Sequence, residues 1–541
     1  MTRHGRPRSH AAGDSMSAAL KRRETLGAAN KLILAGQARD ALALLHPLEK
    51  RSRHDADVLR LLAIAYSGVR DMANARRCAE RSHKLRPDPE MLLILAQSDR
   101  AAGRTDQAVH AYDQVLDRFP QAAALATIKK VGALEESGQF AAARAALPPP
   151  ADVDALPRAL RPRARFEEAK LLVHEKEYDD ANRVIDQLVA DPAVESEPRR
   201  ALLHLKAKSC DRAGDYAGAF EAATAANEIG KLPFDPELYA EQVSILIENW
   251  SRDAMPHFPH ADCSSELPVF VAGMPRSGTS LIDQIIDAHP RAAGVGELSD
   301  LERFAVAMST AYDSDLPAPA SFGAYDDKAF TRAAARYVQH CRKLSPRGTD
   351  RVVNKALGNN RLVGLLARLF PRTRIINAVR DPRDVAISCF MGGFNNQLSA
   401  WSTQIDWTAK AWAQSQRMMQ HWKETLDVPI LDVHYEALVA DPEHQFRRII
   451  AFIGLEWDDA CMAFHSSRRT VRTLSYDQVN RPIYRTSSGR HRNYASFIEG
   501  IEFPAYVVRE SEDRARGEIT RTAPSSTARS AGRGTRPARR R

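Results

Sequence analysis

The chain has 541 residues, of which 44% are apolar and 27% charged, and its formal net charge is +9 at pH 7. A chain of this length exceeds one ordinary hydrophobic core, so two or more domains are expected. It has no run of about 18 apolar residues that would cross a membrane, and its basic first residues lack the apolar stretch of a secretory signal. The composition therefore excludes a membrane-spanning protein and predicts a cytoplasmic one.

The basic charge is concentrated at the two ends of the chain. Residues 519–541 contain seven arginines and no acid, and residues 1–23 carry six lysines and arginines against Asp14. The residues between these ends therefore carry a small net negative charge. We expect residues 1–23 and 506–541 to be disordered tails, because they hold too little apolar surface to fold. Such tails are usually solvated, so binding to nucleic acid or an anionic membrane is less favoured.

A short motif recurs from about residue 24 to residue 230, in which a turn residue is followed five positions later by alanine. The spacings between successive copies are 34, 33, 35, 38 and 38 residues. A period near 34 is typical of the tetratricopeptide repeat, a pair of antiparallel helices, and the segment resembles that family. We predict an α-solenoid over residues 24–250, in which each helix pair packs against its neighbours. The copies are Gly36 with Ala41, Arg70 with Ala75, Gly103 with Ala108, Gly138 with Ala143, Lys176 with Ala181, and Gly214 with Ala219.

The resemblance implies that this array holds a protein or peptide, which could include an acceptor substrate. A scaffold for packing or homodimerisation is the alternative. Prolines between Pro148 and Pro162 are expected to kink or split the array.

The pattern changes after residue 250. Residues 251–266 are predicted to be a polar, proline-containing linker. Short apolar runs at 268–272, 374–379 and 428–433 then alternate with segments of helical periodicity. This alternation predicts βαβ units and a mainly parallel sheet over residues 267–505.

A glycine-containing loop follows the first predicted strand. Its sequence is Gly-Met-Pro-Arg-Ser-Gly-Thr-Ser over residues 273–280, and an apolar helix comes next. Such loops bind phosphate-like groups through free backbone N–H groups at a helix N-terminus. The glycine spacing is that of nucleoside triphosphatases, but Thr279 occupies the position of their lysine. Arg276 and the hydroxyls of Ser277, Thr279 and Ser280 suit a smaller group, such as a 5′-phosphosulfate.

This loop resembles that of sulfotransferases, in particular tyrosylprotein sulfotransferases. The resemblance implies a P-loop-like α/β domain that binds 3′-phosphoadenosine-5′-phosphosulfate (PAPS), with the 5′-phosphosulfate held by Arg276, Ser277, Gly278, Thr279 and Ser280. A second segment, residues 379–388, follows a strand and opens a helix. There the resemblance implies that Arg380 and Ser388 bind the 3′-phosphate of the donor.

Further matches extend the resemblance to about residue 495. It implies that Tyr435 contacts the nucleotide. On spacing alone, Arg490 stands where the family has a lysine that reaches the nucleotide. One position departs from the family, because Gly392 occupies the place of an arginine.

Sulfuryl transfer to a hydroxyl requires a base for the proton and positive charge near the leaving oxygen. The resemblance implies that Glu297 is the general base and that Lys355, Ser475 and Arg276 stabilise the leaving phosphate. His289 is a competing base, since small-molecule sulfotransferases use histidine. No metal is expected, because the six cysteines are scattered and no His/Cys/Asp cluster is present.

The sequence thus predicts a PAPS-dependent sulfotransferase that acts on an acceptor hydroxyl. The Glu297 pattern favours a protein tyrosine, while a carbohydrate, a lipid or a small phenol stays open. The rival hypotheses are a P-loop kinase or nucleoside triphosphatase, and an inactive repeat scaffold that retains a nucleotide-binding domain.

Overall fold

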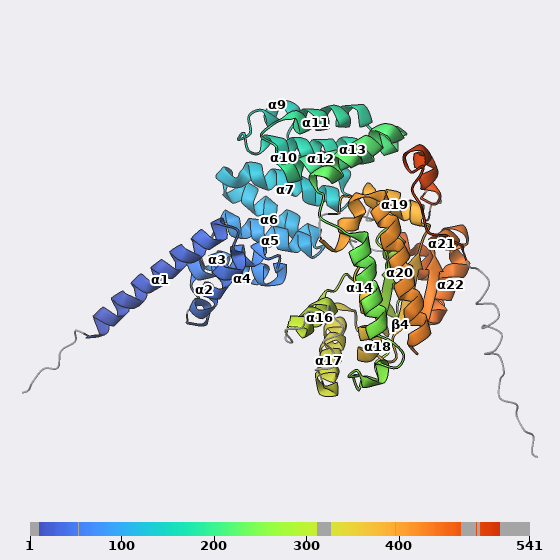
Figure 1. The fold of residues 1–541 in the computed structure, drawn as a ribbon. Helices are drawn as coiled ribbons and strands as arrows, with labels where there is room; N and C mark the ends of the chain where they lie inside the picture. The colour runs from blue at the N-terminus through green and yellow to red at the C-terminus, as the bar shows by residue number, and fades with distance from the viewer. Residues whose placement is uncertain are drawn as a thin grey trace, which may run out of the picture.

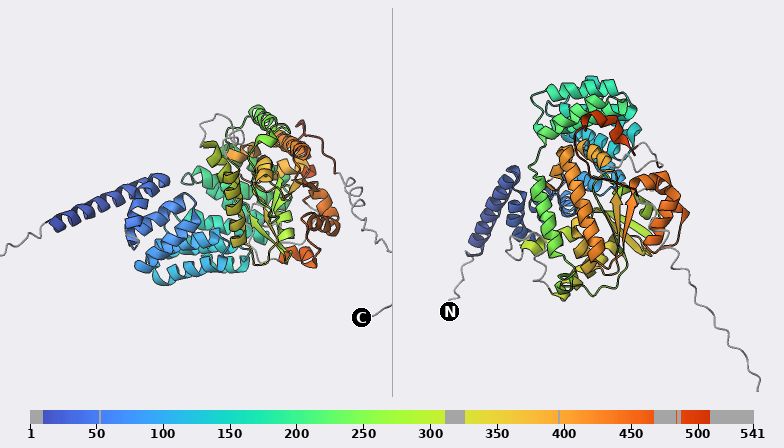
Figure 2. Two further views of the ribbon diagram at one scale, coloured as in Figure 1. Left: turned by 90° about the horizontal axis from the view of Figure 1, so that it is seen from below. Right: turned by 45° about the vertical axis from the view of Figure 1, so that its right-hand side comes forward.

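The computed structural model describes residues 10–51, 54–310, 326–394, 397–466, 483 and 487–508 (Figure 1). A curved stack of helices arches over an α/β domain, and the two parts are in contact (Figures 1 and 2). Ser475 lies outside the described residues. Among the described helices, none has the length and apolar content needed to cross a membrane.

The helical array occupies the N-terminal part of the chain. Successive helices pack against one another along the stack, and α1 projects from its N-terminal end (Figure 1). The helices are α1 (His10–Leu34), α2 (Ala38–Arg51), α3 (Ala56–Gly68), α4 (Met72–Leu85), α5 (Pro89–Ala101), α6 (Thr105–Arg118), α7 (Ala123–Glu136), α8 (Phe140–Ala146), α9 (Pro150–Val153), α10 (Arg161–Glu175), α11 (Tyr178–Ala190), α12 (Ser196–Ala213) and α13 (Tyr216–Ile229).

The repeated motif has a physical basis in the turns of this array. Each of the six turn residues has a positive φ, from 60° to 87°, which ends one helix and allows a tight reversal. Each of the six alanines that follow is 0% exposed, so the next helix packs closely against its neighbour. The predicted helix pairs are therefore confirmed, whereas membership of the tetratricopeptide-repeat family remains a proposal. The short α9 lies in the region between Pro148 and Pro162 where prolines were expected to interrupt the array, and the short α8 ends just before it.

Two domain boundaries differ from the expectation. Helix α1 begins at His10, inside the segment 1–23 that was expected to be disordered, because its alanine-rich sequence favours a helix. Helix α14 (Pro236–Asn249) was assigned to the array, yet Val243 and Leu246 belong to the core of the α/β domain. The Asp235 side chain caps α14 and starts a new helix after the irregular residues 231–235, which separates it from α13.

The α/β domain contains a five-stranded sheet, and every strand pairing among the described residues is parallel, as predicted. The strand order is β2-β3-β1-β4-β5. Phe270 packs into the core on one face, and its neighbours Val269 and Val271 pack into the core on the other face. The strands are β1 (Pro268–Gly273), β2 (Ala292–Gly296), β3 (Arg351–Asn354), β4 (Arg374–Val379) and β5 (Ile430–His434).

Helices cover both faces of the sheet (Figure 2). Side chains of α14, α17, α18 and α20 fill the core on one face, and those of α15, α21 and α22 fill the core on the other. The helices after α14 are α15 (Thr279–Asp287), α16 (Asp300–Thr310), α17 (Asp327–Leu344), α18 (Asn359–Leu369), α19 (Pro382–Phe390), α20 (Ile405–Thr425), α21 (Tyr435–Ala440) and α22 (Pro442–Phe452). The 3-10 helices are η1 (Pro120–Ala122), η2 (Met255–His257), η4 (Gln397–Thr403), η5 (Asp459–Ser466) and η6 (Arg490–Phe497).

The array contacts the α/β domain through α12 and α13, which pack on α19 and η6. The Phe220 ring of α13 stacks on Phe390 and Phe497, at centroid distances of 5.2 and 4.6 Å. The Asn227 side chain donates a hydrogen bond to the Phe390 carbonyl at 2.9 Å. We call this contact the array–domain interface.

Candidate active site

The glycine-containing loop lies at the carboxyl end of β1, between β3 and β4. The strand order diverges here, because β3 and β2 lie on one side of β1 while β4 and β5 lie on the other, and ligands of α/β folds bind at such a point. Gly273 has a φ of +130°, and a Cβ there would lie 2.4 Å from the Ala378 carbonyl oxygen. Gly278 has a φ of +97°, and a Cβ there would lie 2.8 Å from the Tyr435 ring. The loop therefore needs both glycines to pass close to β4 and to Tyr435.

The two predicted anion-binding segments meet in the structure. The Arg276 Nε atom donates a hydrogen bond to Ser388 Oγ of α19 at 2.8 Å. The Arg380 Nη1 atom donates to the Arg276 carbonyl at 2.8 Å. The Arg380 guanidinium also lies over the Tyr435 ring, 4.6 Å from its centroid. Two segments about 100 residues apart thus form one cationic site with Tyr435 as a wall.

Two donor atoms at this site are buried without a hydrogen-bond partner among the described residues. They are the Ser277 hydroxyl and the Arg380 Nε atom. Ser277 is 1% exposed and Arg380 is 5% exposed, so bulk water does not replace the missing partners. Unsatisfied buried donors of this kind are costly unless a ligand accepts from them. The arrangement fits an anion with oxygen acceptors at both segments, as the two phosphate positions of PAPS require.

Glu297 and Lys355 lie together at the ends of the neighbouring strands β2 and β3. The Lys355 ammonium donates a hydrogen bond to Glu297 Oε1. The Lys355 backbone N–H donates to the Gly296 carbonyl at 3.0 Å, which fixes the two strand ends. The Lys355 side chain is 2% exposed and that of Glu297 is 43% exposed. The cation therefore belongs to the interior of the site and the carboxylate to its open side.

Residues 268–459 match the model of the sulfotransferase family. The matched segment contains the whole sheet together with Arg276, Glu297, Lys355, Arg380 and Ser388, and the array lies outside it. We refer to it as the sulfotransferase-family domain.

The chain is also similar to an uncharacterized protein and to two protein-tyrosine sulfotransferases. An uncharacterized protein of Aquifex aeolicus is 27% identical to the chain. The alignment covers 60% of this chain and 44% of that protein. Protein-tyrosine sulfotransferase A of Caenorhabditis elegans is 25% identical to the chain. The alignment covers 39% of this chain and 56% of that protein. Protein-tyrosine sulfotransferase 1 of Danio rerio is likewise 25% identical over 39% of the chain and 60% of the relative. The chain thus spans about half the length of these relatives.

Two solved structures are similar to parts of the chain. The sulfotransferase domain of the Synechococcus PCC 7002 olefin synthase is 20% identical, covers 49% of this chain and 99% of its own, and has a TM-score of 0.34. PilW, a type IV pilus biogenesis factor, is 18% identical, covers 38% of this chain and 90% of its own, and has a TM-score of 0.32.

The competing base, His289, is buried in the sulfotransferase-family domain and is 3% exposed. Its Nε2 atom is 2.8 Å from the Glu456 carbonyl, to which it donates, and its Nδ1 atom accepts from the Arg291 N–H at 3.1 Å. Both ring nitrogens are therefore engaged by backbone groups, one shortly after α15 and the other between α22 and η5. This geometry favours a structural role for His289.

Arg490 lies beyond the matched segment and is paired with the array. Its Nη2 atom is 2.6 Å from Asp211 of α12. Burial alone would lower the pKa of Arg490, but the Asp211 carboxylate holds that pKa above its usual value. The alignment that suggested a nucleotide contact for Arg490 did not predict this partner.

Sequence reasoning also missed Asp384, whose side chain is fully buried in α19. Its carboxylate accepts hydrogen bonds from the backbone N–H groups of Gly489 and His491, at 2.7 and 2.8 Å. It also lies 3.5 Å from the Arg380 guanidinium. Asp384 follows Arg380 by four residues, just inside the first turn of α19, and this close spacing was the available signal.

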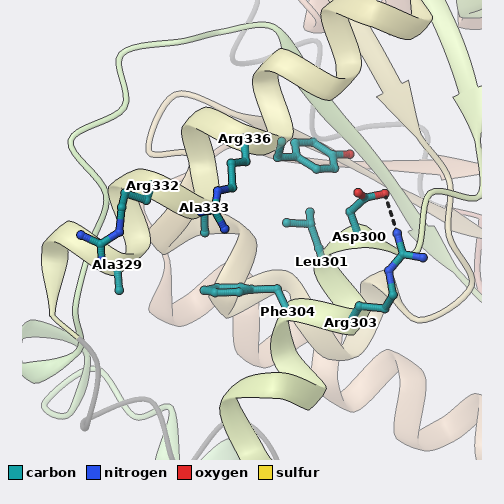
Figure 3. Close-up of a pocket in the computed structure, with 9 residues that line it drawn as sticks. Asp300, Leu301, Arg303, Phe304, Ala329, Arg332, Ala333 and Arg336 are labelled. Carbon is teal, nitrogen blue, oxygen red and sulfur yellow. Dashed lines mark ion pairs between the residues drawn. The ribbon is translucent and has the colours of Figure 1, made fainter. Parts of the chain in front are cut away.

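A cavity of about 420 Å³ opens between α16 and α17 (Figure 3). One of its lining residues is Asp300, three positions after Glu297. Another is Tyr337, whose hydroxyl accepts a hydrogen bond from Asn354, the residue before Lys355. The cavity is therefore linked to the Glu297–Lys355 pair through residues close to each of them in the chain, although neither of the two lines it. Its lining residues are Asp300, Leu301, Arg303, Phe304, Ala329, Arg332, Ala333, Arg336 and Tyr337. Within the described part of the chain, no group of three or more His, Cys, Asp and Glu side chains could hold a metal ion.

Proposed function

We propose that the chain is a sulfotransferase that moves a sulfuryl group from PAPS to an acceptor hydroxyl, with a protein tyrosine as the favoured acceptor. The observation that carries the proposal is the contact of Arg276 with both Ser388 and Arg380. This contact joins a loop suited to a phosphosulfate to a helix suited to a second phosphate. Neither the phosphosulfate site nor the second phosphate site requires the loop lysine of a nucleoside triphosphatase. Thr279 occupies the position of that lysine.

The neighbouring strand ends supply the reacting groups. The acceptor oxygen attacks the sulfur in line, the sulfur–oxygen bond to the donor phosphate breaks, and the acceptor proton passes to Glu297. Lys355 and Arg276 offset the negative charge that develops on the departing phosphate oxygen. The ion pair between Lys355 and Glu297 holds both groups at one point before the substrates arrive. Ser475, which the family resemblance assigns to the leaving phosphate, is retained in this proposal.

The cavity whose lining begins three residues after Glu297 supports an aromatic acceptor. Phe304, Leu301 and Tyr337 line it with apolar surface, and Figure 3 shows arginines around these side chains. Among the described residues, Arg332 and Arg336 have no ion-pair partner, whereas Arg303 lies 3.5 Å from Asp300. The ring of a tyrosine would pack against these apolar side chains. Acidic residues next to that tyrosine in a peptide would pair with Arg332 and Arg336.

Donor binding should depend on Arg380 and not on divalent metal. In calorimetry with adenosine 3′,5′-bisphosphate, the wild type should bind with the same affinity in EDTA as in magnesium. Arg380→Gln should weaken binding roughly 10- to 100-fold, because a charged hydrogen bond to phosphate is lost. Arg383→Gln is the matched control three residues further along the chain, in the first turn of α19, since Arg383 pairs with Asp381. Binding of ATP that requires magnesium, without binding of the bisphosphate, would instead favour the P-loop kinase hypothesis.

A further inference from the structure

One face of α12 is directed at the donor side of the α/β domain. Arg200, His204, Ala207 and Asp211 follow the spacing of a single helical face. The Arg200 guanidinium donates a hydrogen bond to the Phe394 carbonyl, just beyond the end of α19. Burial lowers the pKa of His204 to about 4, so the ring next to Arg200 is neutral at pH 7. This face of α12 therefore forms part of the array–domain interface.

Asp211 is the acidic end of this face. Its Oδ1 atom accepts a hydrogen bond from the Tyr494 hydroxyl at 2.5 Å and pairs with Arg490 at 2.6 Å. Tyr494 is 0% exposed, and its pKa is raised by burial and by the bond to Asp211. Removal of Asp211 would leave a largely buried guanidinium without its counter-charge, which is costly.

The segment that Asp211 anchors also holds the predicted 3′-phosphate site. Arg380 Nη2 donates to the Ser487 carbonyl, and Asp384 accepts from the Gly489 and His491 N–H groups. Residues 487–494 thus bridge Asp211 of the array to Arg380 and Asp384 of α19. We call these residues the bridging segment.

The bridge leaves one buried donor of Arg380 available. Its Nη1 and Nη2 atoms are occupied by the Arg276 and Ser487 carbonyls, while Nε has no partner among the described residues. The orientation of that Nε atom therefore depends on the bridging segment. A shift of the Ser487 carbonyl would turn the guanidinium away from its ligand.

We propose that Asp211 is a positioning residue of the donor site, so that the helical array determines discrimination in favour of a 3′-phosphorylated donor. The inference rests on the proposed function, because it assigns the 3′-phosphate to Arg380. Asp211 acts through Arg490, Tyr494 and the bridging segment, and it does not touch the nucleotide. The sulfotransferase-family domain is then incomplete without the last helix pair of the array.

The test compares two nucleotides that differ at the 3′ position. Asp211→Asn should weaken calorimetric binding of adenosine 3′,5′-bisphosphate about 10-fold, because the charged anchor of the bridging segment is lost. Binding of adenosine 5′-phosphosulfate, which lacks the 3′-phosphate, should stay within about 2-fold of the wild type. Asp186→Asn is the matched control. Asp186 of α11 forms an ion pair at 2.6 Å with Lys206 of α12, the helix that also carries Asp211.

Tyr494→Phe provides a milder second variant that keeps the buried ring and removes only the hydroxyl bond to Asp211. It should reduce binding of the bisphosphate in the same direction by a smaller factor. Unchanged discrimination in a folded Asp211→Asn protein, or an equal loss for both nucleotides, would overturn the inference. A wild type that binds neither nucleotide would instead contradict the proposed function.

Discussion

Glu297→Gln should lower the rate of sulfuryl transfer by roughly 10²- to 10⁴-fold, because the amide keeps the shape of the side chain but cannot accept the acceptor proton. Donor affinity should stay nearly unchanged, since Arg276, Arg380 and Ser388 form a separate group of contacts. The Glu297 side chain is 43% exposed, so the substitution removes no core packing. The measurement is single-turnover transfer from labelled PAPS to a glutamate–tyrosine copolymer, beside calorimetric donor affinity.

Two further variants make this result specific. Glu302→Gln changes a nearby acid on α16 and should leave turnover within about 2-fold of the wild type. His289→Ala tests the competing base, and it should lower stability, because His289 is buried and bonded to backbone groups at both nitrogens. If Glu297→Gln transferred sulfate at the wild-type rate while His289→Ala kept its stability and lost activity, the base would be His289.

The parts of the structure that the sequence predicted are those governed by local rules. The positive φ of Gly36, Gly103 and the equivalent turn residues explains the repeated motif. The apolar runs became buried parallel strands, and the glycine loop followed the central strand. In each case a backbone conformation or the burial of a side chain limits which residue types can occupy a position. These limits act over a few neighbouring positions, so the pattern can be recognised in one sequence.

Contacts between distant segments were predicted less well. The resemblance brought Arg276, Ser388 and Arg380 into one site, and the structure places them in contact. It could not foresee that Asp211 would pair with Arg490, because the array lies outside the sulfotransferase match and its packing on η6 is a property of the whole fold. Helix α14 was misassigned for a similar reason. Its helical pattern resembles the array, but its apolar side chains pack on α20.

The proposed mechanism divides the site into two sides that can be tested separately. In it, Arg276, Arg380 and Ser388 form the donor side at the ends of β1 and β4. Glu297, at the end of β2, and the cavity between α16 and α17 would form the acceptor side. Lys355 belongs to both, since it is buried in the site and bonded to Glu297. Its substitution should therefore affect the chemical step and also the position of the base.

Lys355→Met should lower transfer by roughly 10²- to 10³-fold, because no ammonium remains to offset the charge on the departing phosphate oxygen. Methionine fills the buried position without leaving a charge there, so the melting temperature should change little. The double variant with Glu297→Gln should lose less activity than the product of the two single losses, because contacting residues that act in one step are not additive. Single-turnover rates of the four proteins measure this coupling. Independent, multiplying losses would show that Lys355 and Glu297 act in different steps, and wild-type transfer by Lys355→Met would remove Lys355 from the mechanism.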